Sequence, residues 1–182
     1  MLKFYNDNVF FISDIHFNHK NIIQYDNRPF DNIIQMNDIV IQNWNKKITN
    51  NDIVFFLGDF AFANVENLSK YANALNGKIY FIKGNHDILK DLKKTNRFED
   101  IFTFGEEISI QKQHIILCHF PLMEWHGKEN NSWHLHGHSH GKLYNTNPLY
   151  YENCYVKDVS SNMINYTPIS FNEIKKEFEQ NK

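Results

Sequence analysis

Acidic, amide and histidine side chains follow short apolar runs at several places in this chain. They are Asp14 and His16, Asp59, Asn85 and His86, His119, and finally His138 and His140. A continuous apolar run is typical of a buried strand, and the sheets of α/β proteins place functional groups at strand ends. We therefore expect these side chains to converge on one edge of a sheet. Two carboxylates, one amide and several imidazoles gathered there would form a ligand set for two divalent metal ions.

Two pairs of these residues have a spacing that suits a shared site. Asp14 and His16 are separated by one residue, as are His138 and His140. In an extended segment, side chains at positions i and i+2 point the same way. Each pair can therefore present two groups to one site.

Glycine placement supports the same interpretation. Three of the seven glycines stand immediately before proposed ligands, namely Gly58, Gly84 and Gly137. Glycine permits the tight turn that brings backbone and side chain close to a ligand. Each polar residue taken alone also has a structural explanation, because aspartate and asparagine are common turn formers. The full set of segments favours a common site instead.

The elements that must position these residues can be read from apolar patterns. Strands are expected over residues 8–13, 53–57, 78–83, 107–111, 114–118, 132–136 and 154–160. A helix is expected after an N-cap at Asp31, with an apolar face that includes Met36, Val40 and Trp44. Further helices are expected over residues 64–76 and 87–94, and after a cap at Ser170. The pattern predicts a mixed α/β protein in which two packed sheets lie between helices.

Length and composition favour a single domain over residues 1–182. The net charge of −2 argues against an extended nucleic-acid surface, which is usually basic. No apolar stretch approaches the roughly 20 residues needed to span a bilayer, so no membrane partner is expected. The N-terminus does not resemble a signal peptide, and the two cysteines do not form a disulfide framework. A cytoplasmic protein is the expectation.

Five segments of the chain resemble the motifs of the calcineurin-like metallophosphoesterases. The segments are SDIH, LGDF, GNHD, CHFP and HGHSH. The family pattern is DxH, GD, GNH, a separate His and then GHxH. The match runs from about residue 10 to residue 142. The resemblance implies a four-layer α/β/β/α sandwich of two mixed β-sheets flanked by helices, with a dimetal centre. By motif, one ion would be bound by Asp14, His16 and His140, and the other by Asn85, His119 and His138. Asp59 would bridge both ions. His86 would be the catalytic imidazole, which binds no metal.

In two-metal sites the ions lower the pKa of bound water toward roughly 7 and stabilise the charge of an in-line displacement at phosphorus. His86 would donate a proton to the leaving group or stabilise the charge on the phosphoryl oxygens. Nitrogen and oxygen ligands suit manganese, which we expect first, or iron, zinc, nickel or cobalt. The chain departs from the pattern GDxxD of many relatives, because Phe62 stands where they carry an acid that pairs with the catalytic histidine. Asp87 follows His86 directly, but adjacency alone does not establish a contact.

Three further residues near the motifs are candidates for substrate binding. They are His19, Arg28 and His126. Arginine can clamp phosphate through two hydrogen bonds, and loops at the sheet edge would form the rim of the pocket. The alternatives are a structural ion pair for Arg28 and a helix cap for His19. Trp125, in the same expected loop as His126, is a candidate for stacking on a nucleobase.

The sequence therefore predicts a metal-dependent phosphoesterase, with a phosphodiesterase acting on a nucleotide or other small diester as the leading hypothesis. A phosphomonoesterase, including a protein phosphatase, is the alternative within the same chemistry. A non-catalytic scaffold on the same fold is a third hypothesis, which the filled motif positions disfavour. The sequence does not indicate an oligomeric state.

Overall fold

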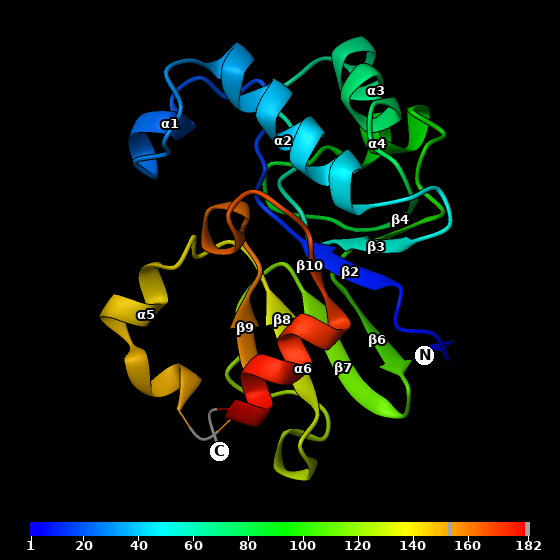
Figure 1. The fold of residues 1–182 in the computed structure, drawn as a ribbon, viewed down its shortest axis with the longest axis vertical. Coiled ribbons are helices and arrows are strands. Elements are labelled where there is room, and N and C mark those ends of the chain that lie inside the picture. Colours follow the sequence, from blue (N-terminus) through cyan, green and yellow to red (C-terminus); the bar gives the residue numbers. More distant parts are fainter. Residues whose placement is uncertain (153, 181–182) are drawn as a thin grey trace.

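The structure, a computed structural model, describes residues 1–152 and 154–180 and contains two five-stranded sheets (Figure 1). The first sheet has the order β10-β2-β3-β4-β5. Its strands are β2 (Val9–Ile12), β3 (Ile53–Phe56), β4 (Lys78–Ile82) and β5 (Asp100–Phe102), which are parallel, and β10 (Ile169–Ser170), which is antiparallel to β2. The carboxyl ends of its four parallel strands therefore lie at one edge.

The second sheet has the order β1-β6-β7-β8-β9. Its strands are β1 (Leu2–Phe4), β6 (Gly105–Ile110), β7 (Gln113–Cys118), β8 (Trp133–His136) and β9 (Val156–Asp158). Strands β6 and β7 are antiparallel, and the other neighbours are parallel. Both sheets are mixed, so the expected fold class is confirmed.

Helices flank both sheets. They are α1 (Ile22–Tyr25), α2 (Ile33–Lys47), α3 (Val65–Asn73), α4 (Leu89–Lys94), α5 (Lys142–Thr146) and α6 (Phe171–Gln180). Figure 1 shows α2, α3 and α4 beside the first sheet and α6 over the second. Short 3-10 helices cover Lys128–Asn130, Pro148–Tyr151 and Ser161–Ile164. Within the described residues, no helix is long and apolar enough to cross a membrane.

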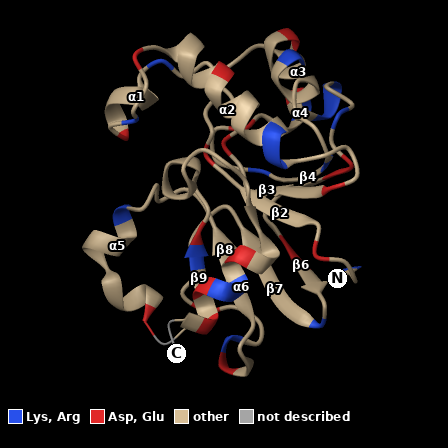
Figure 2. Ribbon diagram, viewed as in Figure 1, with Lys and Arg blue, Asp and Glu red and all other residues tan. Residues whose placement is uncertain are grey.

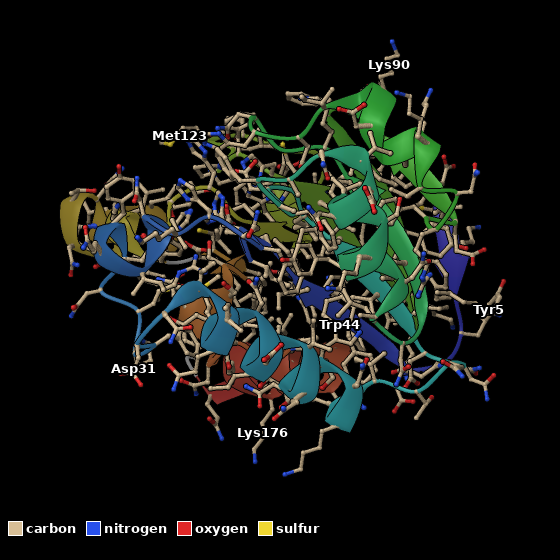
Figure 3. All side chains as sticks on the ribbon, turned by 90° about the horizontal axis from the view of Figure 1, so that it is seen from above. Tyr5, Asp31, Trp44, Lys90, Met123 and Lys176 are labelled. Carbon is tan, nitrogen blue, oxygen red and sulfur yellow. The ribbon has the colours of Figure 1, made fainter. Side chains whose placement is uncertain are left out.

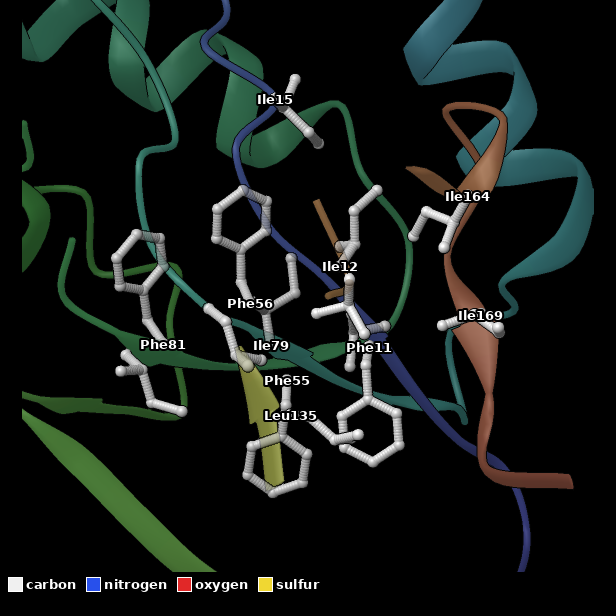
Figure 4. Close-up of a cluster of buried hydrophobic side chains, with 14 of the residues drawn as sticks. Phe11, Ile12, Ile15, Phe55, Phe56, Ile79, Phe81, Leu135, Ile164 and Ile169 are labelled. Atoms are coloured by element: carbon white, nitrogen blue, oxygen red, sulfur yellow. The ribbon is translucent and has the colours of Figure 1, made fainter. Parts of the chain in front are cut away.

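Phenylalanine fills the space between the sheets (Figure 4). Phe4 of β1 meets Phe55 of β3 edge to face, with ring centroids 5.6 Å apart. Phe55 also stacks on Phe11 of β2, at 6.0 Å. Phe11 and Phe55 are fully buried, as is Leu135 of β8. Because burial of each such side chain stabilises the fold by roughly 1.5–3 kcal/mol, this core fixes the two sheets against each other.

Helix α2 buries one face against the first sheet, as its apolar spacing predicts. Met36, Val40 and Trp44 are fully buried, and Figure 3 places Trp44 on the inner side of the helix. The indole Nε1 of Trp44 donates a hydrogen bond to the carbonyl of Asn76 at 2.9 Å. The buried tryptophan is therefore both packed and satisfied in its polar atom.

The cap of α2 differs from the prediction by one residue. Asn32, not Asp31, accepts hydrogen bonds from the amides of Ile34 and Gln35. Asn32 has the extended backbone that an N-cap needs. Asp31 instead accepts a hydrogen bond from the side chain of Gln35, one turn into the helix.

The cap of α6 is formed by Ser170, as predicted. Its hydroxyl accepts from the amide of Glu173 at 3.2 Å, while the Glu173 carboxylate accepts from the amide of Ser170 at 2.8 Å. This reciprocal pair is a capping box. It orients α6 so that Phe171 and Phe178 pack on Trp133 of β8, with ring centroids 5.2 and 5.1 Å away.

Candidate metal centre

The proposed ligands all lie just beyond the carboxyl ends of five strands. Asp14 and His16 follow β2, Asp59 follows β3, Asn85 follows β4, His119 follows β7, and His138 and His140 follow β8. Strands β2, β3 and β4 belong to the first sheet and β7 and β8 to the second. A backbone bridge between Ser13 and Ser160 joins the two sheets at this edge. The structure thus gathers side chains that are up to 126 positions apart in the sequence.

One group of donor atoms surrounds the carboxylate of Asp14. Its Oδ1 lies 3.8 Å from Nε2 of His16 and 3.3 Å from Nε2 of His140. Asp14 Oδ1 and His16 Nε2 are buried and have no hydrogen-bond partner. Leaving a buried polar atom unpaired costs roughly 1–3 kcal/mol. A cation held by Asp14, His16 and His140 would satisfy these atoms, so the residues present fit a metal ion.

A second group surrounds the amide oxygen of Asn85. Its Oδ1 lies 2.8 Å from Nε2 of His119 and 3.0 Å from Nδ1 of His138. Nδ1 of His119 lies 2.7 Å from the carbonyl oxygen of Leu57, which can only accept, so this nitrogen carries the proton. In the neutral ring Nε2 therefore presents a lone pair toward the oxygen of Asn85. Two acceptors that face each other also fit a bound cation.

The carboxylate of Asp59 lies between the two groups. Its Oδ2 is 3.7 Å from Nε2 of His16 in the first group and 3.6 Å from Nε2 of His119 in the second. Its Oδ1 accepts a hydrogen bond from the amide of His86 at 2.9 Å. One oxygen is thus fixed by the backbone while the other faces both groups, which suits a bridging position.

His140 is oriented by an aspartate that the sequence analysis missed. Its Nδ1 donates to Oδ2 of Asp26 at 2.5 Å, which turns Nε2 toward Asp14. A metal-binding histidine is commonly held through its other nitrogen in this way. Asp26 precedes Arg28 by two residues and pairs with its guanidinium at 3.0 Å. That short acid–arginine spacing is the signal in the sequence that could have revealed the pair.

The prediction that Arg28 binds substrate is wrong in this structure. Its side chain is fully enclosed, and its guanidinium donates to the carbonyls of Asp14 and Ile15 at 2.9 and 2.8 Å as well as to Asp26. Every nitrogen therefore already has a partner inside the protein. Arg28 holds the backbone that carries Asp14, and the ion-pair alternative describes it correctly.

Asp87 joins two of the loops and does not bind His86. Its carboxylate accepts from the amides of Asp59 at 2.7 Å, Phe60 at 3.0 Å and Gly84 at 2.8 Å. It therefore ties the loop after β3 to the loop after β4. Because the site needs both loops in register, Asp87 acts on it through the backbone.

Asp158 plays the corresponding part for the loop that carries His138 and His140. Its Oδ2 accepts from the hydroxyl of Ser139 at 2.6 Å and from the amide of Gly141 at 2.8 Å. Its Oδ1 lies 2.5 Å from the hydroxyl of Ser160, which also lies 3.0 Å from Asp14. The sequence analysis missed this residue, because an isolated acid at a strand end carries no periodic signal.

The three glycines before the proposed ligands are required by close packing. At Gly58, where φ is +89°, an added Cβ would lie 2.6 Å from Nδ1 of His119. At Gly84 a Cβ would overlap the carboxylate of Asp59, and at Gly137 it would overlap that of Asp14. Any larger residue would therefore displace a side chain of the candidate centre.

Five of the seven proposed ligands occupy the left-handed backbone region. These are Asp14, His16, Asp59, His138 and His140, with φ between 49° and 65°. Such conformations cost of order 1–3 kcal/mol each and cluster at functional sites. The fold holds this strain through the hydrogen bonds described above.

The surroundings of the candidate ligands leave His16 without a proton on one ring nitrogen and favour the doubly protonated ring of His140. Burial lowers the pKa of His16 to about 3, so its ring is neutral and can offer a lone pair. Burial also disfavours charge on His140, but the neighbouring carboxylates of Asp14 and Asp26 outweigh it and raise its pKa to about 9. Burial raises the pKa of the Asp59 carboxyl. A cation at His140 must therefore displace a proton at neutral pH.

His86 stands at the edge of the centre, with its side chain 47% exposed. Its Nε2 lies 3.9 Å from Oδ2 of Asp59, which is beyond hydrogen-bond distance. The ring of Phe62 lies 5.0 Å away, and Phe62 in turn stacks on His19 at 4.1 Å. The structure thus brings His19 to the rim beside His86, as the sequence suggested.

The structure does not place His126 and Trp125 at the rim of the candidate centre, where the sequence suggested them. His126 is bound to Glu107 of β6 at 2.6 Å, and its ring packs edge to face on His114 of β7, away from the proposed ligands. Trp125 is buried, and its indole nitrogen donates to the hydroxyl of Ser132 at 3.0 Å. The contacts of both residues are thus with the second sheet and its loop, and the structure does not bring them to the proposed ligands.

Comparisons with known proteins agree with the geometry. Residues 8–171 match the family model described as calcineurin-like phosphoesterase. The chain is 36% identical over 181 residues to the uncharacterized protein MJ1445 of Methanocaldococcus jannaschii, an alignment that covers 96% of this chain and 93% of that protein. It is also similar to the crystal structure of AQ665 from Aquifex aeolicus, a protein of unknown function, with a TM-score of 0.72 and 26% identity. That similarity covers 92% of this chain and 97% of the Aquifex chain.

Proposed function

This chain belongs to the calcineurin-like phosphoesterase family and is a metal-dependent phosphoesterase, and we propose that it hydrolyses small phosphodiesters, nucleotides among them. The observation that carries the proposal is the carboxylate of Asp59, which lies between two sets of donor atoms. A site of this kind suits a phosphate group, whose oxygens can be shared by two cations.

The donors divide into two sets. We propose that Asp14, His16 and His140 hold one ion, that Asn85, His119 and His138 hold the other, and that Asp59 contributes to both. The donors are nitrogen and oxygen without thiolate, which supports manganese first and iron, zinc, nickel or cobalt as alternatives. When bound, two such ions supply an ionised water and neutralise charge on the phosphoryl oxygens.

His86 is the proposed general acid. Its side chain is exposed at the edge of the centre, and its ring nitrogen is not hydrogen-bonded to Asp59. It is therefore free to hold a proton toward the oxygen of the leaving group. The backbone amide of His86 is fixed by Asp59, so the ring stays close to the donor atoms.

The arrangement of the two arginines supports a diester over a monoester. Arg28 is enclosed with Asp26, and Arg97 donates to the carbonyls of Leu75 and Gly77. The chain has no other arginine, so none is available to clamp a doubly charged phosphate. A phosphodiester carries a single negative charge and has less need of such a clamp.

The distribution of charge supports a small substrate. Figure 2 shows basic and acidic residues interspersed along α3 and α6. With a net charge of −2, the chain lacks the basic excess that an extended nucleic-acid surface requires. A short nucleotide or another small diester fits the proposal.

The test compares two chromogenic substrates with purified protein and manganese. Bis-p-nitrophenyl phosphate is a diester and p-nitrophenyl phosphate is a monoester. We expect the larger kcat/KM for the diester. A larger value for the monoester would make the protein a phosphomonoesterase, and hydrolysis of neither, with metal bound, would contradict the proposal.

A further inference from the structure

Phe62 lies at the rim of the candidate centre, in the loop that follows β3 and carries Asp59. Its ring packs against three imidazoles: His19 at 4.1 Å with 19° between the planes, His86 at 5.0 Å with 46°, and His16 at 5.9 Å with 34°. An apolar ring that is 39% exposed and surrounded by site histidines does not belong to the hydrophobic core. Its place calls for a functional explanation.

Among the residues that the structure describes, the nearest carboxylate oxygen paired with the ring of His86 is Oδ2 of Asp59, and its distance of 3.9 Å is beyond hydrogen-bond range. Asp87 is committed to three backbone amides. Asp59 fixes only the backbone amide of His86, and its other oxygen lies 3.9 Å from the ring nitrogen. Two aromatic rings neighbour the imidazole of His86. The ring of Phe62 is the nearer, with its centroid 5.0 Å away, and that of His16 lies 5.7 Å away.

The segment that carries Phe62 is itself fixed, although the ring is partly exposed. The amide of Phe62 donates to the carbonyl of Phe17 at 2.8 Å, and its carbonyl accepts from the side chain of Asn18 at 3.2 Å. Ala61 forms a backbone bridge with Phe17. His19 lies nearly parallel to the ring and supports it from the other side. The position of the Phe62 ring is therefore restricted, although the ring is partly exposed.

We propose that Phe62 is a positioning residue that sets the orientation of His86 by ring packing, in place of a hydrogen bond from an acid. The inference rests on the proposed role of His86 in phosphodiester hydrolysis. Phe62 restricts the rotation of the His86 imidazole and keeps this ring beside the donor atoms. His19 packs on the other side of Phe62. Aromatic rings attract each other in offset and tilted arrangements, so a contact of this geometry favours one orientation of an exposed ring.

The first experiment compares variants of Phe62 with bound manganese and the diester substrate. We expect Phe62→Ala to lower kcat about tenfold, a part of the 10²–10⁴-fold that general acid catalysis provides, with KM and metal content unchanged. Phe62→Tyr keeps the ring and should restore kcat to within about twofold, because packing is the property that matters. Phe104→Ala, which removes a phenylalanine that is 66% exposed before β6, is the matched control and should leave kcat unchanged.

A double-mutant cycle separates positioning from a general structural effect. In the background of His86→Gln, Phe62→Ala should cause no further loss of kcat, because there is no imidazole left to orient. An equal loss in both backgrounds, or a failure of Phe62→Tyr to restore kcat, would overturn the inference. Phe62→Leu, which keeps apolar bulk without a ring, replaces Phe62→Ala if that variant does not fold.

A readout independent of turnover distinguishes failure of this inference from failure of the proposed function. If the wild-type protein hydrolyses neither substrate, the proposed function fails, and the orientation of His86 is then read from crystal structures of wild type and Phe62→Ala. One ordered ring in the wild type and several in the variant would support the positioning role. A single, unchanged ring in both would contradict it.

Discussion

At the scale of residues, the candidate centre depends on histidines whose protons are directed by neighbours. Nδ1–H of His119 donates a hydrogen bond to the carbonyl of Leu57, and Nδ1–H of His140 donates one to Asp26. In each case the opposite nitrogen is aimed at the donor cluster. Which nitrogen carries the proton is thus set by Leu57 and Asp26, which are not among the proposed ligands.

The raised pKa of His140 predicts how the metal-free protein responds to pH. Burial lowers this pKa, but the neighbouring carboxylates of Asp14 and Asp26 outweigh burial and raise it from the ordinary 6.5 to about 9. The folded state therefore favours the proton, so its contribution to stability is complete below pH 6.5 and is lost as pH rises through about 9. Metal-free protein should show a Tm that falls by a few degrees over this range relative to His140→Gln, at about 2–4 °C for each kcal/mol. Parallel curves for the two proteins, measured by calorimetry, would contradict the assignment.

Two substitutions should separate metal binding from turnover. Asp59→Asn removes a charge that faces both donor sets, so it should lower metal content from two ions per chain and abolish measurable hydrolysis. His86→Gln should keep the metal content and lower kcat about 10²–10⁴-fold, the usual contribution of a general acid. Metal analysis of the dialysed proteins, beside kinetics, is the measurement. Equal metal loss in both variants would mean that the two roles are assigned wrongly.

At the scale of elements, the loops after the strands are held together by buried acids and closely packed glycines. Asp87 connects the loops after β3 and β4, and Asp158 holds the loop after β8 beside the residues that follow β9. Gly137 lets the β8 loop pass against the carboxylate of Asp14. The spacing of the donors is thus set by contacts between loops.

Gly137→Ala tests this contact. Its Cβ would overlap the carboxylate of Asp14 and the side chain of Ser13, so we expect a loss of about 1–3 kcal/mol of stability, as for other overpacked positions, and weaker metal binding. Gly127→Ala is the control. Gly127 has a φ of +75°, so alanine is strained there, but its neighbour is Ser132, outside the centre. The control should lose stability and keep its metal affinity in a calorimetric titration; equal loss of affinity in both variants would argue against a specific contact.

The sequence predicts the donor loops well because each one follows an apolar run that is long enough to recognise. It also predicts the face of α2, through Met36, Val40 and Trp44, because helical spacing is a local property. Asp26 is paired locally with Arg28, but its contact with His140 spans 114 positions and could not be predicted from spacing. Asp158 escaped prediction because its contacts with Ser139 and Gly141 carry no pattern. The orientation of Arg28 could not be predicted either, since nearness in sequence does not say whether a side chain points into the protein or into the cleft.

The same limit applies to the short strands. β1, β5 and β10 have two or three residues each, too few for a periodic pattern, and their pairing with distant strands gives them their place. The expected strands, by contrast, lie within a few residues of the observed ones. Local patterns therefore predicted the longer strands and β9, and non-local pairing gives the short edge strands β1, β5 and β10 their place.

At the scale of the whole molecule, the two sheets share one phenylalanine-rich core and one donor cluster. Each sheet supplies part of each cluster of donors, since Asp14 and His16 belong to the first sheet and His140 to the second. We expect residues 1–182 to behave as one domain, with a single unfolding transition in calorimetry. Bound metal should raise its Tm, because ions that bind only the folded state stabilise it. Two separate transitions would contradict the single-domain expectation.

The most direct test of the central claim is anomalous diffraction from crystals grown with manganese. We expect two peaks, one among Asp14, His16 and His140 and one among Asn85, His119 and His138, with Asp59 between them. The absence of peaks from these positions, or peaks only at another cluster such as Glu107, His114 and His126, would contradict it.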